Sequence, residues 1–296
     1  MPRFSRTLLA LPLLILAGCQ PTRPPSPAAQ KLIDAQTMSG PVNTKVQARP
    51  FTYPVKSAEL SLWDIKVFDV KDKDNGLRQE WKHFAQIPQQ PGATITNTQV
   101  LMNGWIISRD GTIFLPQKPT YKAYGSFYTD WTLPRPGDYT LWLEYQPSVA
   151  HEEELSAAEL INRKASYNLP REVAHWDFKA VGETLPTKGE TQFSSSLPFA
   201  IPVYDAKGNV AREKVSVNPP EVRAGRKTEL AWKVEGSAPV ENPEVVAIAP
   251  DSSTLLHGIG ASPELTFTRA GEWKLWFNYM RGDQSFAAPY VLKVAP

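Results

Sequence analysis

One thiol is available for covalent chemistry in this chain, the side chain of Cys19, which is the only cysteine among 296 residues. It directly follows two small residues, Ala17 and Gly18, and an apolar run that begins at Leu8. Two arginines precede the run, and a basic start followed by a short apolar segment is typical of an export signal. The run is too short to span a bilayer, which takes about 20 apolar residues. Because an exported chain with a single cysteine has no internal disulfide to form, this thiol is free for another use.

The segment Leu16-Ala17-Gly18-Cys19 resembles the lipobox of bacterial lipoproteins. The resemblance implies that residues 1–18 are a signal peptide, that the chain is cut before Cys19, and that this cysteine carries diacylglycerol and palmitate. Each buried CH₂ group contributes about 0.8 kcal/mol, so several acyl chains would anchor the protein to a membrane. Gln20 follows the cysteine, which by resemblance implies the outer membrane if the host has one, and otherwise the outer face of the cell membrane. The alternative to a lipobox is a plain secretory signal. We expect no cofactor besides the lipid on Cys19.

Histidines are the other residues whose chemistry could define a site, and no two of them are close in sequence. They are His83, His151, His175 and His257. Zinc and copper sites bring together two to four ligands, and none of the spacings here matches one. We therefore expect surface or loop positions and no metal site. The weak candidate is His257, with Met102 or Asp251 as a second ligand.

Signals of enzymatic or nucleic-acid function are missing. The sequence has no Gly-x-Ser-x-Gly element and no phosphate-binding glycine loop, and residues 71–76 fit a hairpin turn better than a calcium loop. We expect no catalytic residues and no enzyme. Loss of Arg3 and Arg6 with the signal leaves 30 basic and 30 acidic residues, so no basic field exists to attract nucleic acid.

The elements that would position any site are short alternating runs, which predict an all-β protein. We expect a disordered Pro-rich tether over 19–50, a first β-sandwich over 51–147, a linker over 148–190 with a short helix at 151–164, and a second β-sandwich over 191–296. In Ala58–Val70 the apolar phase slips between Leu62 and Ile65, which suggests a bulge or bend.

An internal repeat supports two units of like fold. Residues 136–145 (PGDYTLWLEY) match 270–279 (AGEWKLWFNY) at a constant offset of 134 residues. Period-2 alternation predicts that one side of each segment is buried. These buried residues are Tyr139, Leu141, Leu143 and Tyr145 in the first copy, and Trp273, Leu275, Phe277 and Tyr279 in the second.

Trp142 and Trp276 fall on the opposite side of these segments and are the candidate partner-binding residues. Two interpretations are open. The indole rings pack against the helix, the linker or the other domain, or they form an exposed aromatic platform for a partner protein or glycan.

The matching strands resemble the YtkA-like group of secreted immunoglobulin-like β-sandwich domains, which occur in bacterial lipoproteins that handle copper or other heavy metals. The resemblance rests on a strand that ends in Ser-x-Asp at Asp110, a loop, and the Gly-x-aromatic-x-Leu-Trp element. It implies tandem immunoglobulin-like sandwiches. Family members carry imidazoles where this chain has Asn103 and Pro116, and the second copy retains only His257.

From these observations we expect a non-enzymatic binding or structural module of the cell envelope. Its partners would be the membrane, through the lipid anchor, and another envelope component, either a protein or a glycan. The alternative is a metal-handling lipoprotein that uses His257.

Overall fold

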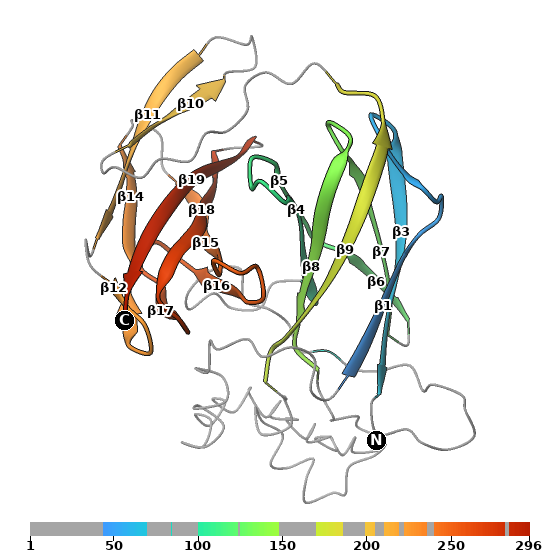
Figure 1. The fold of residues 1–296 in the computed structure, drawn as a ribbon, viewed down its shortest axis with the longest axis horizontal. Helices are drawn as coiled ribbons and strands as arrows, with labels where there is room; N and C mark the ends of the chain where they lie inside the picture. The colour runs from blue at the N-terminus through green and yellow to red at the C-terminus, as the bar shows by residue number, and fades with distance from the viewer. Residues whose placement is uncertain are drawn as a thin grey trace, which may run out of the picture.

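The computed structural model describes residues 44–69, 84, 100–123, 125–147, 170–185, 199–204, 210–218, 222–235, 240–281 and 284–296. Every regular element in these ranges is a β-strand, so the all-β prediction is confirmed (Figure 1). The helix expected at 151–164 and the turn expected at 71–76 lie outside the described residues, as does Cys19. In the described ranges, no helix qualifies as a membrane span.

Strands β1–β9 form the N-terminal half, in which two sheets face each other across a core. The N-terminal outer sheet contains, in spatial order, β1 (Thr44–Pro50), β3 (Leu60–Asp69), β7 (Ser126–Thr132) and β6 (Thr120–Ala123). The N-terminal inner sheet contains β2 (Val55–Ser57), β9 (Glu172–Gly182), β8 (Gly137–Tyr145), β4 (Met102–Ser108) and β5 (Phe114–Gln117). Trp63, Ile65 and Phe127 of the outer sheet meet Leu141 and Leu143 of the inner sheet in one buried cluster.

Strands β10–β19 form the C-terminal half. The C-terminal inner sheet contains β12 (Val222–Arg223), β19 (Gln284–Ala295), β18 (Gly271–Arg281), β15 (Glu241–Ile248) and β16 (Leu255–Ile259). A second sheet contains β10 (Phe199–Tyr204), β11 (Val210–Asn218) and β14 (Ala231–Glu235), and a pair is formed by β13 (Lys227–Glu229) and β17 (Glu264–Thr266). Leu230 and Trp232 pack with Trp273, Leu275 and Phe277 in the core of this half.

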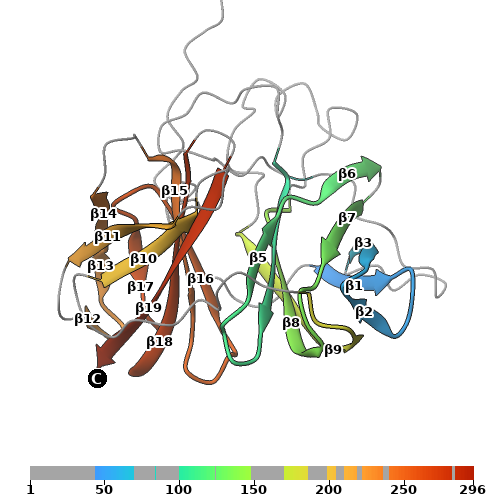
Figure 2. The same cartoon turned by 90° about the horizontal axis from the view of Figure 1, so that it is seen from above.

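The two inner sheets have the same strand order and directions. In each, a short edge strand runs parallel to the last long strand, and the remaining pairs are antiparallel. Strands β8 and β18, which carry the two copies of the repeat, occupy the central position of their sheets. Viewed from above, β5 and β8 stand opposite β16 and β18, so the inner sheets face each other (Figure 2).

The predicted buried side of the repeat is confirmed in both copies. The exposed fraction is 2% or less for each of its side chains: Tyr139, Leu141, Leu143, Tyr145, Trp273, Leu275, Phe277 and Tyr279. Both segments therefore place their alternating residues in the core of their own half, as period-2 geometry requires.

Two segment boundaries differ from the prediction. Residues 44–50, expected in the tether, form edge strand β1, where Pro50 is tolerated because it ends the strand. Thr44 is buried, and its hydroxyl donates to the carboxylate of Glu172 and contacts the hydroxyl of Tyr145, which ties the start of β1 to the inner sheet. Residues 172–182, expected in the linker, form β9, whose partly buried Trp176 packs on the N-terminal core.

The bulge expected near Leu62 is also absent from β3. The register between β3 and β7 is unbroken from Leu60 to Lys66. Trp63 and Ile65 point into the core, whereas Leu60 and Leu62 point outward and are exposed. The apparent slip of phase therefore reflects apolar residues on the outer side of a regular strand.

Candidate functional site between the two halves

An apolar contact joins the two inner sheets. On the N-terminal side it contains Trp105, Ile107, Trp142 and Val173, and on the C-terminal side Val246, Ile248, Leu255 and Trp276. All of these side chains are at most 5% exposed. At about 25 cal/mol per Å² of buried apolar surface, a contact of this kind holds the halves together.

The structure therefore decides between the two interpretations of Trp142 and Trp276. Their exposed fractions are 2% and 1%, so the rings do not form an exposed platform. They pack against the opposite half, and Trp276 stacks on Phe114 of β5 with the ring centroids 5.0 Å apart. The sequence could not show this because alternation reveals that a side chain leaves its own core, but not what covers it.

A buried charged cluster lies beside this apolar contact, centred on His257. The imidazole Nδ1 lies 2.7 Å from Glu144 Oε2, and Nε2 lies 3.2 Å from Glu244 Oε2. The His257 side chain is 1% exposed and that of Glu144 is fully buried. The expectation of a surface or loop histidine was wrong: His257 is on β16, and its imidazole bridges a carboxylate from each half.

Further polar groups complete this cluster. Asn103 donates to Glu144 at 2.8 Å and Arg171 pairs with Glu144 at 3.1 Å, while Asn278 donates to Glu244 at 3.0 Å. Glu144 and Asn278 occupy equivalent positions of the repeat, and each lies opposite its partner on the neighbouring strand. Each half thus contributes one Asn–Glu pair, and His257 joins the pairs.

The pKa values show that the cluster is ionised near neutral pH. Burial, the largest influence, lowers the pKa of His257, but the charges of Glu144 and Glu244 and their hydrogen bonds together raise it from 6.5 to about 9. Burial acts to raise the pKa of Glu144, yet His257, Arg171 and the hydrogen bonds from His257 and Asn103 lower it from 4.5 to about 2. Two carboxylates on two ring nitrogens favour an imidazolium that donates both protons.

This arrangement bears on the metal hypothesis. An imidazole binds a metal through a ring lone pair, and both nitrogens of His257 are engaged with carboxylates. Met102 is buried in the N-terminal core, and Asp251 pairs with Arg269, so neither suggested second ligand contacts His257. No group of three or more His, Cys, Asp or Glu side chains in the described ranges could hold a metal ion.

An equivalent loop contact marks the same edge of each inner sheet. Asp110 pairs with Arg135, and Asp251 pairs with Arg269, each carboxylate also accepting from a hydroxyl two residues ahead. Burial acts to raise the pKa of Asp110, but hydrogen bonds from Ser108, from the backbone and hydroxyl of Thr112 and from Arg135 together lower it to about 2. The two loops are therefore fixed in position.

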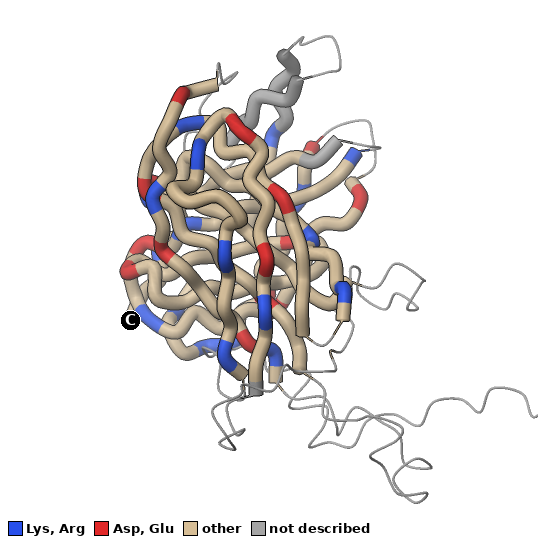
Figure 3. Tube along the Cα trace, turned by 90° about the vertical axis from the view of Figure 1, so that its right-hand side faces the viewer, with Lys and Arg blue, Asp and Glu red and all other residues tan. Residues whose placement is uncertain are grey.

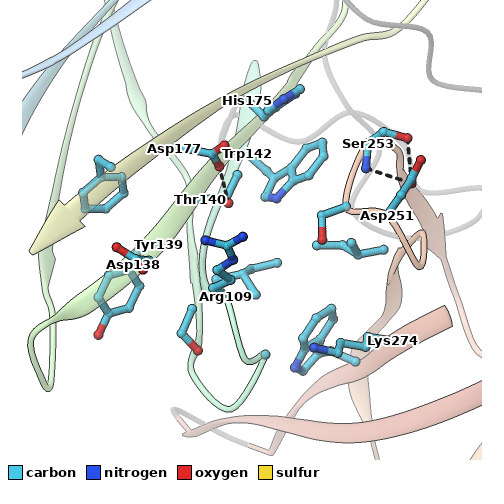
Figure 4. A pocket seen from close by; sticks show the side chains of 17 residues that line it. Arg109, Asp138, Tyr139, Thr140, Trp142, His175, Asp177, Asp251, Ser253 and Lys274 are labelled. Carbon is cyan, nitrogen blue, oxygen red and sulfur yellow. Dashed lines mark hydrogen bonds between the residues drawn. The ribbon is translucent and has the colours of Figure 1, made fainter. Parts of the chain in front are cut away.

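A cleft of about 600 Å³ opens between these loops, bordered by Trp142 and Trp276 (Figure 4). Its polar side chains come from both halves: Arg109, Asp138, Thr140, His175 and Asp177 from the N-terminal half, and Asp251, Ser253 and Lys274 from the C-terminal half. Figure 4 shows Arg109 reaching into the middle of the cleft, while Lys274 extends from the opposite wall.

Several of these groups are held by neighbours. Thr140 donates to Asp177 at 2.6 Å, and Lys274 donates to the carbonyl oxygen of Asp110 at 3.0 Å, a bond that crosses between the halves. His175 stacks on Trp142 with the ring centroids 4.7 Å apart. The hydroxyls of Thr140 and Ser253 both donate to carboxylates, of Asp177 and Asp251 respectively. The polar side chains that line the cleft can form hydrogen bonds and ion pairs with a polar ligand.

Sequence reasoning singled out His257 but missed most other residues of the cluster and the cleft, above all Glu144, Glu244 and Arg109. One signal was present. Glu144 lies in the same outward phase as Trp142, and because tryptophan is highly buried on average, this phase indicates a covered surface beside the carboxylate. The sequence matches no known family and no curated protein.

Proposed function

We propose that this protein is a lipid-anchored envelope protein that binds a polar segment of another envelope component in the cleft between its two halves. The observation that carries this proposal is the cleft itself: its walls come from both halves, and a buried contact fixes those walls relative to each other. A preformed cleft avoids the cost of ordering its walls on binding.

The architecture behind the proposal is a pair of immunoglobulin-like sandwiches that arose by duplication. Three correspondences support it: the common strand order of the inner sheets, the central position of both repeat copies, and the Asp–Arg contact at the same edge of each half. In both copies, the first buried aromatic residue also donates a side-chain hydrogen bond to the carbonyl oxygen of the arginine four residues before it. The donors are the hydroxyl of Tyr139 and the indole N–H of Trp273.

The groups in the cleft indicate what kind of ligand it would hold. Arg109 has no carboxylate within salt-bridge distance among the described residues, so its guanidinium can pair with a ligand acceptor. Asp138 is exposed on the same wall and can accept from ligand donors. Cations and carboxylates together suit a ligand that carries donors and acceptors, such as a peptide segment or a glycan. Lipidation at Cys19 would keep this cleft next to the membrane that carries the partner.

Site-specific photo-crosslinking in living cells tests the proposal. A photoreactive residue in place of Asp138 should trap a discrete adduct, and Arg109→Glu in the same chain should remove that adduct. The same residue in place of Lys233, exposed on β14, is the control and should trap nothing. Equal adducts at both positions, or an adduct insensitive to Arg109→Glu, would refute the assignment of the cleft.

A further inference from the structure

Several large hydrophobic side chains of the N-terminal half are exposed to solvent. They are Phe51, Tyr53, Leu60, Leu62, Tyr128, Val181 and Leu185. In the C-terminal half, no large hydrophobic side chain is comparably exposed within residues 214–218, 222–235, 240–281 and 286–296. Folding does not require the exposed set, since each half has its own closed core.

Five of these side chains lie on the N-terminal outer sheet or in the turn after β1. Leu60 and Leu62 point outward from β3, and Tyr128 points outward from β7, diagonally across from Leu62. Phe51 stacks on Tyr128 with the ring centroids 6.2 Å apart, and Tyr53 follows two residues later. We call these five residues the outer patch.

The outer patch protrudes. Tyr53 is 83% exposed, Phe51 64%, Leu60 63% and Leu62 50%. Side chains that stand out into solvent do not form a pocket, and a partner with a rigid surface would need a matching set of cavities. A lipid bilayer needs none, because acyl chains and headgroups rearrange around inserted aromatic and aliphatic groups.

The surroundings of the patch fit the interfacial zone of a bilayer. Lys122 lies 5.9 Å from the ring centre of Tyr128, Arg49 is exposed two residues before Phe51, and the exposed Lys56 pairs with Glu59, the residue before Leu60. Long basic side chains can reach phosphate groups while their stems cover apolar surface. Figure 3, which views the molecule from this side, shows basic and acidic residues interspersed along the strands, so attraction to anionic lipid would be weak. Insertion of apolar groups would therefore supply most of the free energy of membrane binding.

The chain outside the described residues makes this contact geometrically possible. Between Cys19 and Thr44 lie 24 residues, which can span at most about 86 Å. Thr44 begins β1, an edge strand of the sheet that carries the patch, and Phe51 directly follows the end of that strand. A lipid on Cys19 would thus hold this sheet at a high effective concentration near the bilayer, where a weak patch is enough.

We propose that the outer patch docks the N-terminal half onto the lipid surface, so that the protein lies against its membrane in a defined orientation. This inference rests on the proposed lipid anchor for its biological setting, but the patch binds lipid by itself. Lipid binding by the patch can be separated from anchoring through Cys19, because the patch is tested in a chain that carries no acyl group on Cys19.

The test uses the mature chain with Cys19→Ser, which is unlipidated and free of cysteine. A single Leu62→Cys in this background carries an environment-sensitive fluorophore. Vesicles of phosphatidylcholine, and of phosphatidylethanolamine with phosphatidylglycerol, should both shift its emission to the blue. The same fluorophore on Lys233→Cys, at an exposed position on β14, should not respond.

Flotation with the same vesicles measures the binding itself. The unlabelled Cys19→Ser chain should float, and Leu60→Ser with Leu62→Ser should reduce its partition by about tenfold or more. Lys233→Ser with Glu235→Ser is the matched control, because it changes two exposed residues at the same spacing and leaves the net charge unchanged. It should float like the parent chain.

Three results would overturn the inference: no flotation of the Cys19→Ser chain, equal flotation of the Leu60 and Leu62 variant, or a dimer in light scattering that this variant disperses. The last would assign the patch to a second copy of the chain. Failure of the patch would leave lipidation at Cys19 intact, which palmitate labelling of the native chain reports independently.

Discussion

Removal of the His257 imidazole should strongly destabilise the junction between the two halves. In the His257→Ala variant, Glu144 stays fully buried but loses the partner at 2.7 Å. Arg171 and Asn103 still contact it, and Glu244, with 22% of its side chain exposed, can recruit water. The main cost therefore falls on Glu144.

Breaking a buried ion pair by removing one partner typically costs about 3–5 kcal/mol. Since whole domains are stable by only about 5–15 kcal/mol, such a loss is a large fraction of the total. Substitution of an exposed loop residue typically changes stability by only about 0.5 kcal/mol or less. Because both charges are buried, the expected loss of stability in His257→Ala is nearly ten times larger than that.

Urea unfolding followed by tryptophan fluorescence gives the measurement, because the ring of Trp105 lies 5.1 Å from the imidazole. The midpoint for His257→Ala should fall well below the native value. His175→Ala is the control, since His175 is exposed, and it should change stability by less than about 1 kcal/mol.

A double variant separates lost charge pairing from lost packing. Glu144→Gln with His257→Gln removes both of these charges and should recover much of the loss, since neither is left buried alone and Arg171, with 18% of its side chain exposed, can contact water. If His257→Ala unfolds at the same urea concentration as His175→Ala, the central role of the cluster is refuted.

The remaining predictions concern pH, the two cores, the anchor and metals. Since the pKa of His257 is raised to about 9, its stabilisation is complete below pH 6.5 and lost as the pH rises through 9; thermal unfolding at pH 6 and 10 should show this fall, and His257→Gln should abolish it. Since the pKa of Glu144 is lowered to about 2, its contribution is complete above pH 4.5 and lost toward pH 2, which the same scans at low pH will detect. Leu141→Asp and Leu275→Asp each place a charge at a fully buried position and should unfold the half concerned, a loss of several kcal/mol that circular dichroism would reveal; folded variants would contradict the core assignment. Cys19→Ser should abolish palmitate labelling while the globular part still folds, and label on that variant would exclude the anchor. Titration calorimetry with Cu(I), Cu(II) and Zn(II) should show no submicromolar one-to-one binding, and such an isotherm abolished by His257→Ala would restore the metal hypothesis.

Local patterns in the sequence were enough to identify the two strands of the repeat and their core-facing sides. Leu141 and Leu275 were placed correctly because alternation with a period of two is imposed by the backbone of a single strand. The repeat likewise indicated two matching segments, and both lie at the centre of sheets with the same strand order. Each of these features is contained within a single segment of about ten residues.

Segment boundaries were harder to predict than strands. Thr44 belongs to β1, although its neighbours in sequence read as a Pro-rich tether. What makes this segment a strand is pairing with β3 and the hydrogen bond from Thr44 to Glu172, which is 128 positions away. No local composition carries that information.

What covers the second side of a strand was decided only by the tertiary structure. Trp142 and Leu62 both point away from the core of the N-terminal half, yet Trp142 is 2% exposed and Leu62 is 50% exposed. The difference arises because a second inner sheet packs over β8, whereas nothing in the described chain packs over that part of β3. His257 illustrates the same limit, since its charge depends on Glu144, 113 positions earlier in the chain. Periodicity records the geometry of one strand, while burial and ionisation depend on the sheets and charges that folding brings against it.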